Sequence, residues 1–173
     1  MIVNPALLLG PGDLAGSSTE DVRRALEQPM PVVPAGGYAF VDVRDSAEGM
    51  LLALEKGRAG ERYLLVSCNC TVRSFLGRVN RVADVDAPVF SLPRNPMLER
   101  ATRWLAKQAQ TVLGEDEALP DEHSIELAQH FWYVDSTKAE NELGWVSRDP
   151  MTTLADTVED LRERGVVVQR AAR

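Results

Sequence analysis

Residues 10–16 (GPGDLAG) form a glycine-rich turn of the kind that could bind a phosphate. In dinucleotide-binding loops, backbone N–H groups and the start of a helix hold the pyrophosphate. Pro11 lacks an N–H group, and a proline-rich stretch over residues 28–34 occupies the place of the second strand and its ribose-binding acid. We therefore interpret residues 10–16 as a structural turn.

Histidine is the usual base for nucleophilic catalysis, and the chain has only two histidines, His123 and His130. Neither lies in a recognisable catalytic motif. His130 adjoins an aromatic run, which favours packing or a position in a pocket wall, whereas His123 lies in an acidic loop. Either histidine could contact a substrate, but no residue of the chain is assigned as catalytic.

Cys68 and Cys70 are separated by one residue, which places both thiols on the same face of an extended segment. Two cysteines are too few for a disulfide framework, and the further Cys or His ligands of a zinc site are missing. We expect both cysteines to be reduced and buried, and we expect no metal site.

Asp42 and Asp45 are paired carboxylates that could in principle perform acid–base chemistry. Asp45 is better explained as a helix N-cap, with Glu48 at the capping-box position. Arg44 lies between the two aspartates and is a plausible salt-bridge partner. The sequence therefore favours a structural role for this pair.

The elements that must position these residues alternate between strands and helices. Residues 1–9 (MIVNPALLL) predict a strand buried on both faces, and residues 38–43 and 63–67 predict two further strands. A helix over residues 46–56 would bury a stripe at positions i, i+3, i+4 and i+7, namely Ala47, Met50, Leu51 and Leu54. Further helices are expected after Ser18, from Thr71, over about 97–112, over 136–143 and after Asp149. The pattern predicts a mixed α/β fold.

Composition limits the class of protein. The 173 residues are 45% hydrophobic and 26% charged, and no linker divides them, so we expect a single globular domain over residues 1–173. The formal charge of −7 opposes binding to nucleic acid or to an anionic membrane. No apolar run approaches the roughly 20 residues that span a bilayer, and the start lacks a secretory signal. We therefore expect a cytoplasmic protein.

Three blocks of sequence occur in order: VNPALLLGPGD, YAFVDVRDSAEGMLLALEKGRAGERYLLVS and DSTKAENELGW. Together they resemble the extended short-chain dehydrogenase/reductase superfamily, and within it the NAD-dependent epimerase/dehydratase branch near the dihydroflavonol 4-reductases. The resemblance covers nearly the whole chain but only the C-terminal half of such an enzyme, from the sixth strand of its Rossmann sheet. It implies a partial Rossmann-type sheet of C-terminal strands, with the small α/β substrate-binding subdomain.

The resemblance also indicates what the chain lacks. No glycine-rich nucleotide loop follows a first strand, and none of Tyr38, Tyr63 and Tyr133 is followed four residues later by Lys, so the Tyr-x-x-x-Lys pair of the family is missing. Hydride transfer in the family relies on a tyrosine acid whose pKa is lowered by that lysine and by the cofactor. We therefore expect the complete enzyme to bind NAD or NADP, and this chain alone to bind neither and to be inactive.

By resemblance, four residues of the first strand would flank the nicotinamide in a complete enzyme: Val3, Asn4, Pro5 and Leu8. Pro5 is the strongest single candidate, and the alternative is that it only shapes a sheet edge. Tyr38 stands where nucleotide-sugar epimerases of the superfamily carry an Arg for the diphosphate, which disfavours nucleotide sugars as substrates.

Aromatic residues indicate the class of substrate. The candidate lining of a substrate pocket consists of Tyr38, Phe40, Phe131, Trp132 and Tyr133. Such a pocket would fit a small carbonyl compound or an apolar ketone better than a polyanion. Three adjacent aromatic residues are also common in an ordinary core.

The absence of the N-terminal half of the family's fold implies an interaction surface on this chain. It also leaves two hypotheses for the function. The strand Ile2 to Leu9 would lose one neighbour, and its exposed edge would favour a homodimer or association with a separate polypeptide that supplies the Rossmann half. The first hypothesis is the substrate-binding portion of an NAD(P)-dependent oxidoreductase, inactive without the missing half. The alternative is a non-catalytic binding or interaction module derived from such an enzyme.

Overall fold

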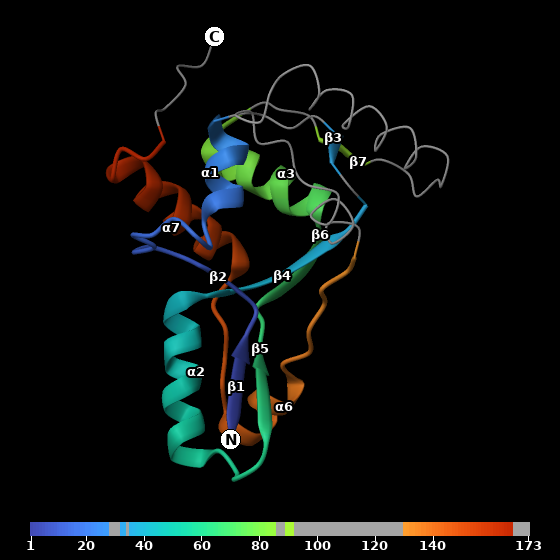
Figure 1. Ribbon diagram of the computed structural model, residues 1–173, viewed down its shortest axis with the longest axis vertical. Helices are drawn as coiled ribbons and strands as arrows, with labels where there is room; N and C mark the ends of the chain where they lie inside the picture. The colour runs from blue at the N-terminus through green and yellow to red at the C-terminus, as the bar shows by residue number, and fades with distance from the viewer. Residues whose placement is uncertain (28–31, 34, 86–88, 92–129, 168–173) are drawn as a thin grey trace, which may run out of the picture.

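The computed structural model describes residues 1–27, 32–33, 35–85, 89–91 and 130–167 (Figure 1). The expected helix over about 97–112, the loop with His123 and most of the proline-rich stretch lie outside these ranges. The elements are β1 (Ile2–Pro5), β2 (Leu7–Leu9), α1 (Glu20–Glu27), β3 (Val32–Val33), β4 (Gly37–Asp42), α2 (Val43–Lys56), β5 (Arg62–Leu65), β6 (Cys68–Thr71), α3 (Val72–Ala83), β7 (Phe90–Ser91), α6 (Thr137–Leu143) and α7 (Pro150–Glu163). The mixed α/β class is confirmed.

The strand expected over residues 1–9 is interrupted at Ala6 and changes partner there. β1 pairs in parallel with β5, from Ile2↔Arg62 to Pro5↔Leu65. β2 pairs in parallel with β4, from Leu7↔Phe40 to Leu9↔Asp42. The break comes directly after Pro5, the last residue that pairs with β5.

The expectation that residues 1–9 are buried on both faces was wrong for β1. Ile2 and Asn4 are exposed, and Leu9 is the first fully buried residue of the chain. Within the described residues, β1 has a strand partner on the β5 side only. An edge strand with little cover keeps one of its faces in solvent.

β4 is the central strand of the larger core. It pairs in parallel with β2 and antiparallel with β6. Helices α1, α3 and α7 gather around it in Figure 1, and they contribute buried side chains such as Leu26, Phe75 and Leu154. The helix from Thr71 and the helix after Asp149 begin as predicted, because each of these residues accepts an N-cap hydrogen bond.

A second core lies between α2, β5 and α6. Its fully buried members are Val41, Ala53, Tyr63, Leu65, Ala139, Leu143 and Trp145. Trp145 follows α6 directly, and its indole N–H donates to the backbone carbonyl of Asp45 at 2.8 Å. This contact fixes the start of α2 against the C-terminal third of the chain.

Two sequence predictions for α2 were wrong. The N-cap is Asp42, whose carboxylate accepts from the backbone N–H of Arg44 at 2.9 Å, and the helix therefore begins at Val43 rather than Ser46. Asp45 instead accepts hydrogen bonds from the backbone and side chain of Arg148, both at 2.8 Å. The local sequence pattern predicts that the Asp45 carboxylate caps the helix, but this carboxylate binds Arg148, which is distant in the sequence.

The stripe predicted to be buried on α2 is exposed. Met50, Leu51 and Leu54 are 41%, 62% and 72% exposed, and Ala47 is exposed as well. The inner face is made of small residues, namely Ser46, Gly49 and Ala53. The helix backbone thus approaches its neighbours closely, and the large apolar side chains face outward.

Candidate functional site

Three of the residues predicted to flank a nicotinamide, Val3, Asn4 and Pro5, lie on β1 next to its open edge, and the fourth, Leu8, lies on β2. The N–H groups of Ile2 and Ala6 donate to carbonyls of the β5 side, Glu61 at 2.8 Å and Leu65 at 2.9 Å. Backbone groups alternate along a strand, so the N–H and carbonyl of Val3 and the carbonyl of Pro5 lie on the opposite edge. Within the described residues, no strand pairs with that edge.

The side chains of the same set point in different directions. Val3 and Leu8 are partly buried and pack against the core around Trp145, Pro5 is partly buried, and Asn4 is exposed. Val3, Asn4 and Pro5 thus follow one another along β1, and Leu8 lies beyond the break, on β2. Their role in cofactor binding stays a prediction.

The five aromatic residues predicted to line a pocket separate into two groups. Tyr38 and Phe40 lie on one face of β4, and both pack edge-on against Phe75, with ring centroids 5.2 and 5.8 Å away. The Tyr38 hydroxyl donates to Asp21 at 2.9 Å, and burial together with that carboxylate raises the pKa of Tyr38 above its usual value. Phe40 is fully buried, so it belongs to the hydrophobic core and is not exposed to a substrate.

The other three residues form an exposed group, which we call the aromatic surface (Phe131, Trp132 and Tyr133). Phe131 forms a parallel bridge with Gly37, and the Trp132 N–H donates to the Gly37 carbonyl at 3.2 Å. A Cβ on Gly37 would lie 2.5 Å from a ring carbon of Tyr133 and 2.9 Å from one of Phe131. Gly37 therefore leaves the space in which the two rings meet, with centroids 5.4 Å apart.

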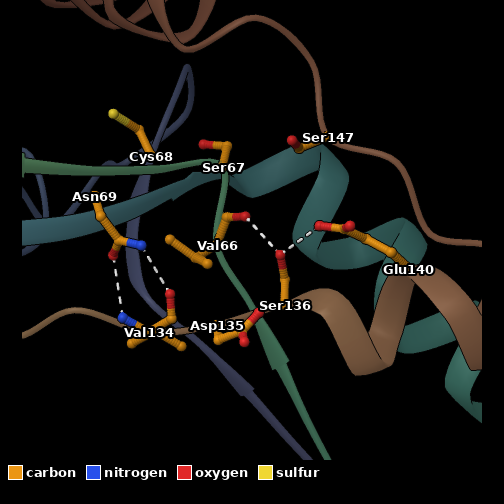
Figure 2. Close-up of a pocket in the computed structure, with 9 residues that line it drawn as sticks. All are labelled: Val66, Ser67, Cys68, Asn69, Val134, Asp135, Ser136, Glu140 and Ser147. Atoms are coloured by element: carbon orange, nitrogen blue, oxygen red, sulfur yellow. Dashed lines mark hydrogen bonds between the residues drawn. The ribbon is translucent and has the colours of Figure 1, made fainter.

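A polar cavity of about 340 Å³ lies beyond the carboxyl end of β5 (Figure 2). Its lining residues are Val66, Ser67, Cys68, Asn69, Val134, Asp135, Ser136, Glu140 and Ser147. The side-chain amide of Asn69 bonds to both backbone groups of Val134, at 2.8 and 3.1 Å. None of the residues predicted for cofactor or substrate lines this cavity.

The cavity carries acceptors and hydroxyl groups from the start of α6. The Ser136 hydroxyl lies 2.7 Å from a Glu140 carboxylate oxygen and 3.3 Å from the Val66 carbonyl. The side-chain and backbone donors of Thr137 hold the pKa of Asp135 below its usual value. Such a lining suits a small polar or cationic group. Sequence reasoning missed this cavity, although Ser136 and Glu140 stand one helical turn apart in DSTKAENELGW.

The two cysteines are free thiols with different surroundings. Cys70 is buried as expected, whereas Cys68 is half-buried, lines the cavity and accepts a hydrogen bond from Arg78 Nη1 at 3.0 Å. Burial, together with the neighbouring Cys68, raises the pKa of Cys70 to about 12. Cys70 therefore stays protonated at neutral pH.

The paired carboxylates Asp42 and Asp45 are held by arginines. Asp42 is fully buried and lies 2.7 Å from Arg44 Nη2 and 3.6 Å from Arg148 Nε. Burial opposes ionisation of Asp42, but the hydrogen bonds from Arg44 outweigh it and hold the pKa of this carboxyl below its usual value. A carboxylate held in this way is a structural anion rather than a proton donor.

Three backbone donors at the end of the glycine-rich turn and just after it are already occupied. The Asp13 carboxylate accepts from the backbone N–H groups of Gly16, Ser18 and Thr19, at 2.9 to 3.0 Å. Backbone N–H groups of this kind would have to be free to bind a phosphate. The observation supports the interpretation of residues 10–16 as a structural turn.

Residues 1–27, 32–33, 35–85, 89–91 and 130–167 contain no group of three His, Cys, Asp or Glu side chains that could hold a metal ion. Across the same part of the chain, no helix has the length and apolar character needed to cross a bilayer.

Comparison with known sequences identifies relatives of about twice this length. A protein of Synechocystis sp., provisionally named a dihydroflavonol 4-reductase, is 30% identical over 96% of this chain and 49% of its own length. Sterol demethylase protein B of Methylococcus capsulatus is 30% identical over 96% of this chain and 51% of its own length. The chain thus spans about half the length of these relatives. No protein-family model matches the sequence.

Solved structures agree with the sequence relatives. The crystal structure of a nucleoside-diphosphate-sugar epimerase from Pseudomonas aeruginosa is 25% identical with a TM-score of 0.74, over 96% of this chain and 49% of the epimerase. The Bordetella bronchiseptica enzyme WbmF, solved with NAD⁺, shares the fold at 16% identity and a TM-score of 0.60, over 95% of this chain and 46% of WbmF. The resemblance to dihydroflavonol 4-reductases and to epimerases, and the Rossmann-type fold, are confirmed.

Proposed function

We propose that this chain, which is related over 96% of its length to one half of dihydroflavonol 4-reductase-like proteins, is the substrate-binding portion of an NAD(P)-dependent oxidoreductase. Residues 1–173 form one domain that corresponds to the C-terminal half of the complete enzyme. The observation that carries the proposal is the open edge of β1, which has a strand partner on the β5 side only within the described residues. A parallel sheet of this kind is normally continued and covered on both faces.

The described residues fit one end of a dinucleotide and not the other. The open edge offers the backbone groups of Val3 and Pro5 beside apolar side chains, a setting that suits a nicotinamide ring and its carboxamide. The N–H groups of Gly16, Ser18 and Thr19, by contrast, are bonded to Asp13 and are not offered to a pyrophosphate. We therefore expect the chain alone to bind neither NAD nor NADP.

In the complete enzyme, the cofactor supplies or accepts a hydride, and this chain orients the reactants. Val3, Asn4, Pro5 and Leu8 would border the nicotinamide. The proton donor of the family is absent here, because no tyrosine of the chain is followed four residues later by lysine. The chain alone is therefore expected to be inactive.

The substrate class follows from the aromatic surface. Its three side chains are exposed and can cover the apolar face of a small molecule. Tyr38, which stands in place of the diphosphate-binding arginine, is engaged by Asp21 instead. The two sequence relatives are named for a dihydroflavonol and for a sterol, not for a nucleotide sugar. We propose a small carbonyl compound or an apolar ketone as the substrate.

A covalent fusion tests this function. In the fusion, the chain replaces the matching half of the Synechocystis relative. Calorimetry with NADH and NADPH should detect no binding to the chain alone and clear binding to the fusion. The fusion should reduce an apolar ketone or a dihydroflavonol and leave a nucleotide sugar unchanged. Nucleotide binding by the chain alone, or a fusion that binds cofactor but turns over only nucleotide sugars, would contradict the proposal.

The exposed Ile2 to Leu9 edge also leads us to propose a protein partner. The candidates are a separate polypeptide that carries the nucleotide-binding half and a second copy of this chain. Light scattering on the purified chain gives its mass in solution, and a mass of two chains would support the homodimer. A monomer that remains monomeric at high concentration would favour the nucleotide-binding half.

A further inference from the structure

The polar cavity beyond β5 contains a hydroxyl group that lies between two acceptors. In Figure 2, the Ser136 hydroxyl lies between the Glu140 carboxylate and the Val66 carbonyl, at 2.7 and 3.3 Å. A hydroxyl carries a single hydrogen, so with Glu140 ionised it can donate to only one of these acceptors at a time. The shorter distance indicates that the carboxylate receives this hydrogen bond.

The Val66 carbonyl is then left without a donor. Val66 is 7% exposed, and within the described residues the Ser136 hydroxyl is the only group that hydrogen-bonds to its carbonyl. A buried carbonyl without a hydrogen bond costs free energy, and nearly all such groups in folded proteins are paired. Because Val66 lines the cavity, a donor bound in the cavity would satisfy its carbonyl.

Two other side-chain donors of the lining are already used. The Ser67 hydroxyl donates to the Phe40 carbonyl at 3.0 Å, and the Asn69 amide donates to the Val134 carbonyl at 2.8 Å. The Ser147 hydroxyl also lines the cavity and can accept as well as donate. The lining therefore offers a ligand mainly acceptors.

The charge of the lining is negative. Asp135 and Glu140 both line the cavity, and the side-chain and backbone donors of Thr137 hold the pKa of Asp135 below its usual value. Among the described residues that line the cavity, none is a lysine, an arginine or a histidine. Arg78 donates to the sulfur of Cys68, and this sulfur points away from Glu140 in Figure 2. The cavity thus favours a cation over an anion.

The size of the cavity and its acceptors indicate the class of cation. The volume of about 340 Å³ is about ten times the roughly 30 Å³ that one water molecule occupies in the liquid, so the cavity has room for a small organic molecule. The described residues contain no group of three His, Cys, Asp or Glu side chains that could hold a metal ion. A primary ammonium group carries three N–H donors and no acceptor, which matches a carbonyl, a hydroxyl and a carboxylate oxygen.

We propose that this cavity binds the primary ammonium group of a small aliphatic amine, with the Val66 carbonyl, the Ser136 hydroxyl and the Glu140 carboxylate as its acceptors. None of the residues predicted for cofactor or substrate lines the cavity, so this site is separate from those of the proposed function. Val66 follows β5 and Ser136 precedes α6, so a bound ammonium group would link these two elements.

An NMR titration of the ¹⁵N-labelled chain, at constant pH and ionic strength, tests the site. The ligand is propylammonium. The controls are 1-propanol, a neutral molecule of similar shape, and tetramethylammonium, a cation without N–H donors. Propylammonium should cause saturable shifts in the backbone amides of Ser67, Asn69 and Ser136, whereas both controls should bind there at least tenfold more weakly.

A pair of variants tests the role of the carboxylate. Glu140→Gln keeps the size of the side chain and removes its charge, so it should weaken propylammonium binding by about tenfold or more, the loss expected for a charge-assisted hydrogen bond. Glu159→Gln in α7 is the matched control, because Glu159 is exposed and does not line the cavity. It removes the same charge and should leave the affinity unchanged. Melting temperatures show whether both variants fold, and the comparison of ligands on the wild-type chain needs no variant.

Several results would overturn the ammonium site. Equal binding of tetramethylammonium would show that charge alone is recognised, and equal binding of 1-propanol would show that charge is not recognised. Propylammonium shifts that fail to saturate, or that lie outside the cavity lining, would place no ammonium site there. An equal loss of affinity in Glu140→Gln and Glu159→Gln would trace the binding to net charge. Acetate that binds the same residues more tightly than propylammonium would assign the cavity to anions and to Arg78.

Discussion

Trp145 lies so close to Gly49 that a Cβ on the glycine would be 3.0 Å from the indole nitrogen. The same Cβ would lie 2.6 Å from a methyl carbon of Leu65. The indole N–H meanwhile donates to the Asp45 carbonyl, one turn earlier on the same helix. Gly49 thus allows α2 to pack directly on Trp145 and β5, and this contact decides which face of the helix points inward.

Gly49→Ala should destabilise the fold by about 1–3 kcal/mol, because the added methyl group overpacks a filled site. Gly77→Ala in α3 is the matched control, since a Cβ there meets no atom within 4 Å. That substitution should instead stabilise the helix by roughly 0.5–1 kcal/mol. Chemical denaturation of the two variants measures both changes. Equal effects of the same sign would contradict the packing described for Gly49.

The α2 helix shows which structural features the local sequence pattern can predict and which it cannot. Apolar spacing correctly predicts a helix that ends at Gly57 and correctly finds a stripe of large side chains. It assigns that stripe to the interior because large apolar residues are usually buried. The inward face is set by Trp145, which is distant in the sequence and invisible to local periodicity. The capping role of Asp45 was mispredicted for the same reason, since Arg148 takes its carboxylate.

Asp42→Ala should be destabilising by about 1–3 kcal/mol, because it removes the N-cap of α2 and the buried partner of Arg44, while Arg148 keeps its bonds to Asp45. Asp156→Ala is the matched control. Asp156 also pairs with Arg44 but is partly exposed, so its loss should cost less than about 1 kcal/mol. Urea unfolding curves for both variants give the two free energies of unfolding. A cost for Asp42→Ala as small as that for Asp156→Ala would contradict the buried-anion description.

Acid should weaken the fold through the same carboxylate. The folded-state pKa of Asp42 is lower than its unfolded value, as is that of Asp13, where burial is outweighed by donors from Thr19, Ser18 and Gly16. A lowered pKa stabilises the fold above the unfolded pKa, near about 4, and this stability is lost as the pH falls through the folded pKa. The melting temperature should therefore stay level from neutral pH to about pH 5 and drop below about pH 4. Asp42→Asn should make that drop smaller, and an unchanged acid limb would contradict the assignment.

The sequence could group those site residues that are neighbours along the chain, but it could not predict contacts between distant segments. Val3, Asn4 and Pro5 stand together because they are consecutive in the sequence, and their role at a nicotinamide stays a prediction. The aromatic residues were grouped by type, but Tyr38 and Phe40 turn toward Phe75 while Phe131 and Tyr133 meet over Gly37. The polar cavity joins the end of β5 to the start of α6, and no local pattern reports that contact.

Removal of the Tyr38 hydroxyl should lower stability without a change of fold. The hydroxyl donates to Asp21 across the contact between β4 and α1, so Tyr38→Phe should cost about 0.5–1.5 kcal/mol. Because burial and Asp21 raise the pKa of Tyr38, its ionisation should lie above that of an exposed tyrosine in a spectrophotometric titration. The difference between wild-type and Tyr38→Phe titrations isolates this group. A normal tyrosine titration in that difference would show that the hydroxyl is free.

Cys68 and Cys70 should differ sharply in their reaction with a thiol reagent. Cys70 is buried and its pKa is raised to about 12, so very little of it is thiolate at pH 8, and only the thiolate attacks a disulfide reagent. Cys68 is half-buried and lines the open cavity, where a reagent can reach its sulfur. Treatment of the native chain with an aromatic disulfide should therefore label one thiol rapidly and the second at least about tenfold more slowly. Peptide mass mapping identifies the labelled site, and Cys68→Ser should abolish the rapid phase while Cys70→Ser leaves it in place. Rapid loss of both thiols before unfolding would show that β6 opens readily, and would contradict the buried position of Cys70.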